Sequence, residues 1–333
     1  MLPGLTPVGS NLPAEGEHGI LGFPSTIVFP ASTNLSGKVF FLNPSLATAS
    51  DNNVGTNPQA PFATLAAAYA ACTDGAGDTI VYVPGATSLT LTAALTWAKS
   101  YTHLIGVAAP TMVAQRARIF QLSTLTGASP LIDVTGSGCI FQNLYIFQGV
   151  ADATSLVNVR VTGSRNYFGN VHFAGGGHAT QAIDGGASLL ISGGSENLFE
   201  DCTVGVDTIS AATGMAALVF AATGGAARNI FRRCHFTLQA GNAGVIWVEV
   251  LGNSGIDRYQ IFDECLFVNL GTSLTQGTAI AAGFDPANKR LLLRNCISIG
   301  AAKWDNADRG AVYGNMNAVT GADLSGAAVQ LIT

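Results

Sequence analysis

Two carboxylates and one arginine, Glu200, Arg232 and Asp263, occupy the same place in three successive copies of a repeated motif. If each copy forms one coil of a solenoid, the two carboxylates lie two coils apart, a distance of about 9.6 Å. That separation is near the upper end of the range found in inverting glycosidases. Glu200 and Asp263, with Arg232 between them, are therefore the best candidates for the catalytic residues of a glycan hydrolase or lyase.

The same column also has a structural explanation. Its charges alternate in sign from Glu200 through Arg232 and Asp263 to Arg294, which gives each rung an oppositely charged neighbour. An arginine between two carboxylates keeps both ionised, whereas a general acid needs a raised pKa. We therefore expect an ion-pair ladder, no catalytic residue and no enzymatic activity.

Other kinds of site have little support in the sequence. His172 and His235 share one repeat position but are separated by the copy that carries Thr203, and we expect them to be unliganded surface histidines. Residues 175–177 are all glycine but lack the Lys-Ser/Thr pair that follows in a phosphate-binding loop. The three tryptophans are scattered, so no aromatic stripe for a carbohydrate is evident. We expect no metal and no cofactor.

The elements that position these residues come from one seven-residue motif that occurs six times. An apolar anchor is followed by an outward residue, a polar bend residue and a small inward residue. The anchors advance in steps of roughly 27, 31, 32, 31 and 31 residues, which is a solenoid period. The anchors are Phe141, Phe168, Phe199, Phe231, Phe262 and Leu293. Short strands without a repeated helix predict an all-β fold, a single-stranded right-handed parallel β-helix with about 30 residues per coil.

Two further positions of the motif predict how the coils stack. The bend position holds Asn143, Asn170 and Asn295 in three copies, and Asn tolerates the left-handed conformation of a sharp corner. The next position should face the interior as a column of small apolar side chains. Four members of that column are cysteines: Cys202, Cys234, Cys265 and Cys296. The cysteines and the anchors together form a predicted structural ladder. We expect the cysteines to be free thiols, which suits folding in a reducing cytosol.

The chain divides into three segments. Residues 1–36 contain five of the twelve prolines and several apolar side chains, which indicates an extended arm that docks on a partner or on its own β-helix. The expected contact residues of the arm are Leu5, Ile20, Leu21, Phe23, Ile27 and Phe29. Residues 37–302 form the β-helix, with a capping helix at about residues 64–72 that begins at Thr64. Residues 303–333 cover the last coil or cross to a partner subunit.

Composition limits the functional classes. Charged residues make up 11% of the 333 residues, against roughly 25% in an ordinary soluble domain. The net charge is -5 with no basic run, which argues against nucleic-acid binding, and no apolar stretch is long enough to span a membrane. No Lys or Arg precedes Lys38, so we expect no secretory signal peptide. A surface with so little charge favours association in a large assembly.

The beginning of the predicted β-helix resembles a known family. The run Gly55-Thr56, Pro61-Phe62 and Thr64-Leu65, followed by a strand at residues 79–85, is similar to the start of pectin-lyase-like right-handed β-helix proteins, particularly those encoded by tailed bacteriophages. The resemblance covers roughly residues 37–300. It marks the fold better than the function, because the superfamily contains polysaccharide lyases, hydrolases, tailspikes and inert virion proteins.

The resemblance and the composition together predict a non-enzymatic capsid decoration or cement protein of a tailed phage. Such a protein is made in the cytoplasm of the bacterial host and lies on the capsid surface of the virion. The expected partners are further copies of itself in a homotrimer, as the resemblance implies, and the major capsid protein or another virion protein, but neither nucleic acid nor membrane. The alternative is a tailspike or receptor-binding protein that binds or cleaves a host surface polysaccharide.

Overall fold

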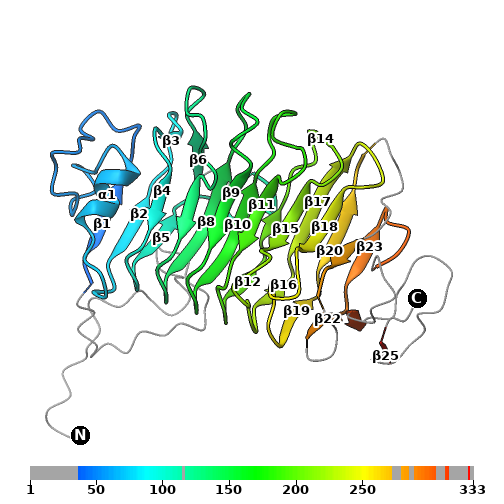
Figure 1. Ribbon diagram of the computed structural model, residues 1–333. Helices are drawn as coiled ribbons and strands as arrows, with labels where there is room; N and C mark the ends of the chain where they lie inside the picture. The colour runs from blue at the N-terminus through cyan, green and yellow to red at the C-terminus, as the bar shows by residue number, and fades with distance from the viewer. Residues whose placement is uncertain are drawn as a thin grey trace, which may run out of the picture.

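The chain forms a right-handed parallel β-helix in the computed structural model, as predicted. Coils of about 31 residues stack along one axis from the N-terminal to the C-terminal end (Figure 1). The structure describes residues 37–114, 117–271, 279–284, 289–304, 312–314 and 329–330. The predicted arm at residues 1–36, and with it Leu5, Ile20, Leu21, Phe23, Ile27 and Phe29, lies outside the described residues, as does most of the predicted C-terminal segment.

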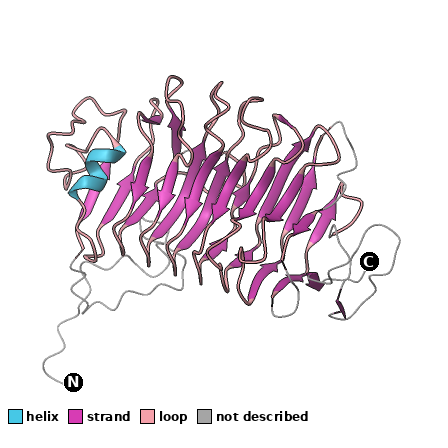
Figure 2. Ribbon diagram, in the orientation of Figure 1, coloured by secondary structure: helices cyan, strands magenta, loops and turns pink. Residues whose placement is uncertain are grey.

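The coils contribute strands to two sheets (Figure 2). The seven-stranded sheet is entirely parallel and consists of β4 (Leu95–Trp97), β7 (Ile132–Val134), β9 (Val157–Val161), β11 (Ala187–Ile191), β15 (Ala216–Phe220), β18 (Ile246–Val250) and β21 (Ile280–Ala282). The larger sheet begins with β1 (Val39–Leu42), β2 (Thr79–Tyr82), β3 (Leu89–Leu91), β5 (His103–Gly106), β6 (Arg118–Gln121), β8 (Ile140–Phe147) and β10 (Tyr167–Ala174). It continues with β12 (Leu198–Glu200), β13 (Thr203–Val204), β14 (Ser210–Ala211), β16 (Ile230–Arg232), β17 (His235–Ala240), β19 (Tyr259–Asp263), β20 (Leu266–Asn269), β22 (Arg290–Arg294), β23 (Ile297–Ile299), β24 (Val312–Gly314) and β25 (Val329–Gln330).

A residue in the left-handed conformation divides each repeated segment of the larger sheet into two halves. The backbone angle φ lies between 49° and 59° at all six bend positions: Asn143, Asn170, Asp201, Arg233, Glu264 and Asn295. The corner is therefore present in every copy of the motif, including the three in which the residue is not Asn. The first half of each segment carries the anchor, and the second half begins with the small inward residue.

The anchors form a continuous stack of rings inside the β-helix. The ring centroids of Phe168 and Phe199 lie 4.7 Å apart, with 3° between the ring planes. Phe141, Phe231 and Phe262 continue the stack with the same near-parallel geometry. All five rings are buried, and each contributes about 1.5–3 kcal/mol relative to an exposed side chain.

The inward cysteines form a second column beside the stacked rings. The Sγ of Cys234 donates to the carbonyl of Phe199 at 3.4 Å, and that of Cys265 donates to the carbonyl of Phe231 at 3.3 Å. Cys202 and Cys296 make the equivalent contacts. All six cysteines of the chain are buried and unbridged, and burial raises the pKa of the Cys234 and Cys265 thiols.

One buried ladder is missing from the sequence predictions. Asn166, Asn197, Asn229 and Gln260 each stand two residues before an anchor and are 0–1% exposed. The Oδ1 of Asn197 accepts from the Asn166 amide at 2.9 Å, and its Nδ2 donates to the Gly163 carbonyl at 3.1 Å. Each ladder side chain satisfies backbone groups of the preceding coil in this way. The repeated Asn-x-Phe spacing in the sequence was the available signal.

The single helix of the described chain, α1 (Leu65–Ala71), lies at the N-terminal end of the stack, where the sequence predicts a capping helix (Figure 1). Thr64 is its N-cap, and its hydroxyl accepts from the Ala67 amide at 3.2 Å. Leu65 is buried against the first coils. At the other end of the helix, the Nζ of Lys99 donates to the carbonyls of Tyr69, Ala70 and Cys72.

The amide ladder leads to a stability prediction. We expect Asn197→Ala to lower the free energy of unfolding by about 2–3 kcal/mol, because it leaves a buried N–H and a buried carbonyl without partners. Urea unfolding followed by circular dichroism measures the change. Asn52→Ala, at an exposed position, is the matched control and should change stability by less than about 0.5 kcal/mol. Equal effects of the two substitutions would contradict the role of the ladder.

Candidate functional site

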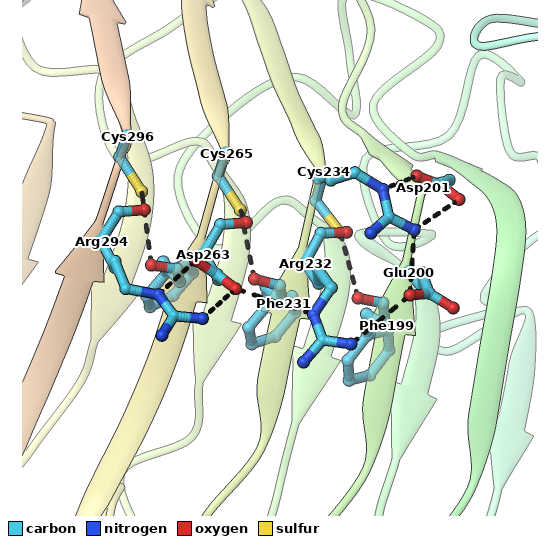
Figure 3. Close-up of polar contacts among 12 residues, drawn as sticks. Phe199, Glu200, Asp201, Phe231, Arg232, Cys234, Asp263, Cys265, Arg294 and Cys296 are labelled. Carbon is cyan, nitrogen blue, oxygen red and sulfur yellow. Dashed lines mark hydrogen bonds and ion pairs between the residues drawn. The ribbon is translucent and has the colours of Figure 1, made fainter.

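The predicted carboxylate column lies on the first halves of the repeated segments, at the ends of β12, β16, β19 and β22 (Figure 3). Glu200 is in register with Arg232, Arg232 with Asp263, and Asp263 with Arg294. The structure therefore brings together the residues that the sequence period aligned. We call these four residues the charged column.

Every member of the charged column has an oppositely charged partner. Arg294 binds Asp263 through two bonds, Nε to Oδ1 at 2.6 Å and Nη2 to Oδ2 at 2.5 Å. The ion pairs of Arg232 are longer, because its nitrogens lie 3.7 Å from oxygens of both Glu200 and Asp263. Arg294, rather than the Arg232 that lies between the carboxylates, is thus the main partner of Asp263.

Two residues that were not predicted complete the surroundings of Glu200. Arg233, a corner residue, places Nη2 2.9 Å from Oε1 of Glu200 and Nε 2.7 Å from Oδ1 of Asp201. The Tyr167 hydroxyl donates to Oε2 of Glu200 at 3.1 Å. The opposite charges of the corner residues Asp201 and Arg233, one coil apart, were the signal in the sequence.

The electrostatics at Asp263 favour its ionised form. The hydrogen bonds from Arg294 hold the pKa of the Asp263 carboxyl below its usual value. A glycosidase general acid needs the opposite shift, a raised pKa. The arrangement is that of an ion-pair ladder, in which opposite charges on neighbouring coils favour the correct register between coils.

A second outer feature lies on the second halves, across β6 and β8. Phe120, Tyr145 and Phe147 are partly exposed, and we call these three rings the aromatic patch. The ring centroid of Phe120 lies 5.9 Å from that of Tyr145 and 5.4 Å from that of Phe147. The Arg118 guanidinium lies 5.6 Å from the centroid of Tyr145, within the range of a cation–π contact. The patch therefore presents apolar ring surface next to a cation.

The prediction that no aromatic stripe exists is wrong for this face. It considered the tryptophans, all three of which are buried. The signal lay instead in the second half of the motif, where Tyr145 and Phe147 alternate with the buried Leu144 and Ile146. Phe120 belongs to the irregular first coils, and only the pairing of β6 with β8 brings it into register with Phe147.

The prediction that His172 is a surface histidine is also wrong. It is 3% exposed, although it follows Tyr145 in the outward column. Its Nδ1 accepts from the Ala114 amide at 3.1 Å, and its Nε2 lies 2.8 Å from the Gly205 carbonyl. Burial lowers the pKa of the imidazole to about 4, so the ring is neutral and carries its proton on Nε2.

No three His, Cys, Asp or Glu side chains in the described ranges are arranged to hold a metal ion. The described part of the chain also has no helix long and apolar enough to cross a membrane.

The comparisons with known proteins concern the fold. No family model and no curated protein sequence matches the chain. A pectin methylesterase from Erwinia chrysanthemi superposes with a TM-score of 0.55 at 16% identity, over 84% of this chain and 90% of its own. A rhamnogalacturonan lyase superposes with a TM-score of 0.52 at 17% identity, over 79% of this chain and 68% of its own. A pectin methylesterase from Aspergillus niger superposes with a TM-score of 0.51 at 14% identity, over 88% of this chain and 90% of its own. These likenesses establish a pectin-lyase-like β-helix fold, as the resemblance in the sequence implied.

The burial of His172 predicts a pH dependence. Its pKa is about 4 in the folded protein, against about 6.5 in an unfolded chain, so the unfolded chain takes up a proton first as the pH falls. The stability that His172 contributes is complete above about pH 6.5 and decreases by about 3 kcal/mol as the pH falls to 4.

Urea unfolding at pH 7 and pH 4 tests this pH dependence. His172→Gln should lose less stability between the two pH values than the wild type does. His178→Gln, which changes a partly exposed histidine, should keep the pH dependence of the wild type. The same loss in all three proteins would rule out His172 as its origin.

Proposed function

We propose that the protein binds a polysaccharide on its aromatic patch, as a receptor-binding protein of the tailspike kind. The observation that carries the proposal is the patch itself, three partly exposed rings on neighbouring coils with Arg118 beside Tyr145. Aromatic rings offer a large apolar face to the C–H surface of a sugar ring, and a neighbouring guanidinium donates hydrogen bonds to its oxygens.

The β-helix holds this patch rigidly. Phe120, Tyr145 and Phe147 lie on paired strands, and the alternate residues on the same strands are buried in the core. A binding site on strands is held more accurately than one on loops. Coils about 4.8 Å apart repeat along a straight axis, which matches an elongated polymer better than a compact ligand.

The structural neighbours support the same reading of the scaffold. The Erwinia chrysanthemi protein is named a pectin methylesterase and another neighbour a rhamnogalacturonan lyase, so this fold serves proteins that are named for polysaccharides. A shared fold does not carry an activity with it, and the proposal therefore depends on the aromatic patch.

We propose binding without cleavage. Glu200 and Asp263, the carboxylates predicted as an alternative catalytic pair, both contact arginines, and the pKa of Asp263 is lowered. A general acid needs a raised pKa, and Asp263 has the opposite shift.

A capsid decoration protein is the second candidate. The observation that favours it is the low charge of 11% together with exposed apolar side chains on the last coils. These side chains are Leu251, Leu270, Ile297 and Ile299. Such a surface favours association, here as a homotrimer that binds the major capsid protein on the virion surface. Cryo-electron microscopy of the particles that contain the protein would show density over the capsid lattice for this role and density at the tail tip for the first.

The binding proposal predicts the effect of removing a ring. The panel for the measurement contains pectin, rhamnogalacturonan, dextran and purified bacterial capsular and O-antigen polysaccharides. Tyr145→Ala should weaken the binding of any polysaccharide that the wild type retains by roughly fivefold to tenfold, because a stacked ring contributes about 1 kcal/mol or more. Affinity electrophoresis and isothermal titration calorimetry measure the change. Tyr259→Ala, at an exposed tyrosine on β19, should bind like the wild type. The proposal fails if the wild type binds none of the panel.

The absence of cleavage is tested on the same panel. We expect no new reducing ends or unsaturated products from the wild type, and unchanged binding by Glu200→Gln and Asp263→Asn. Depolymerisation that either substitution abolishes would establish the catalytic alternative in place of simple binding.

A further inference from the structure

The residues that directly follow β5 cross the outer face of the larger sheet. We call residues 107–114 the strap. The Nδ2 of Asn143 donates to the Ala108 carbonyl at 2.5 Å. The hydroxyl of Thr203 donates to the Met112 carbonyl, and the Ala114 amide donates to His172. The strap is thus attached to three successive coils.

The strap lies directly beside the aromatic patch. Tyr145, His172 and Thr203 follow one another in the outward column, in register on successive coils. Tyr145 belongs to the patch, whereas His172 and Thr203 hold the strap. Both of these outward side chains are almost fully covered, at 3% and 0% exposed. The column is therefore open at Tyr145 and closed over the next two coils.

Among the described residues, the opposite side of the patch is open at β3. On that side, β3 pairs with β6 and places Thr90 in register with Phe120. Thr90 is exposed. A chain that lies along the axis of the β-helix can therefore extend past β3 but meets the strap beyond β8.

Hydrogen bonds, rather than buried side chains, hold the tip of the strap. Met112 and Val113 are 60% and 41% exposed, so they gain little from burial. The bonds to His172 and Thr203 are made by backbone groups of the strap. Removal of these two side-chain partners should release the tip without removing any strap side chain from the core.

We propose that the strap closes one end of the binding platform, so that the aromatic patch receives the end of a polysaccharide chain or a short branch, and not the interior of a long chain. The inference rests on the proposed function and defines the part of the glycan that is recognised. The strap is the specificity-determining element, and His172 and Thr203 are positioning residues that act through it.

Chain-end recognition is tested with the full-length protein and the same panel, intact and after partial acid hydrolysis. Hydrolysis increases the number of chain ends at constant mass. If hydrolysis raises the number of ends roughly tenfold, the mass concentration needed for half-saturation of the wild type should fall roughly tenfold. Equal half-saturation by intact and hydrolysed polysaccharide would overturn the inference.

Two variants test whether the strap is responsible. The double variant His172→Leu with Thr203→Val removes the two side chains that bind the tip of the strap. The variant Ala114→Pro removes the backbone N–H that donates to His172 and leaves His172 and Thr203 themselves unchanged. Ala114 has a φ of 54°, which proline cannot adopt, so this variant displaces the strap even if the double variant fails to fold. Either folded variant should bind intact chains as well as hydrolysed ones. Retention of the preference for ends by Ala114→Pro would overturn the role of the strap.

Controls separate this inference from the proposed function. His178→Leu with Thr208→Val changes two residues that make no bond to the strap and should keep the wild-type preference for ends. Tyr145→Ala should weaken the binding of intact and hydrolysed polysaccharide alike. If Tyr145→Ala has no effect, the proposed site is wrong; if it weakens binding but ends and interiors bind equally, only the strap inference fails. If the wild type binds nothing in the panel, both fail.

Discussion

The hydrogen bonds that join each coil to the next in strict register are the constraint on which this structure depends. Each coil must turn several corners, and the backbone groups at those corners lose water when another coil stacks on them. Asn166, Asn197, Asn229 and Gln260 supply the missing partners at one corner. Because these amides are satisfied only by the neighbouring coil, a coil out of register would leave them buried and unpaired. The stacked rings and thiols follow the same register.

The outer surface inherits this register, and its chemistry therefore occurs in columns. On the first halves the column from Glu200 to Arg294 is charged with alternating sign, and its members neutralise one another. On the second halves the column from Arg118 through Tyr145 to His172 changes from cationic to aromatic to a buried imidazole within a few coils. The same scaffold thus builds a structural ladder and a surface suited to a ligand, and only the outward residue types differ.

The strap shows how an irregular segment modifies a regular fold. It follows β5 and is bonded to three successive coils, so it couples positions that the repeat keeps separate. Its tip is held by hydrogen bonds to Thr203 and His172, and Met112 and Val113 at the tip are exposed, whereas Ala108 at its base packs against the hydrophobic core. Segments with few buried apolar contacts are those that a fold can change or move without unfolding. A rigid platform and a less constrained strap are consistent with a site whose specificity lies in the irregular part.

The sequence alone determined the features that repeat. The anchors from Phe141 to Leu293, the corner residues and the cysteine column recur at a constant period, and a period is visible without a structure. The capping helix followed from local capping and periodicity at Thr64. The Asn-x-Phe spacing of the buried amide ladder repeats in the same way. Only the tertiary structure decided the aromatic patch and the strap, because Phe120 and residues 107–114 lie outside the period, and their positions follow from long-range pairing and from bonds to Asn143, His172 and Thr203.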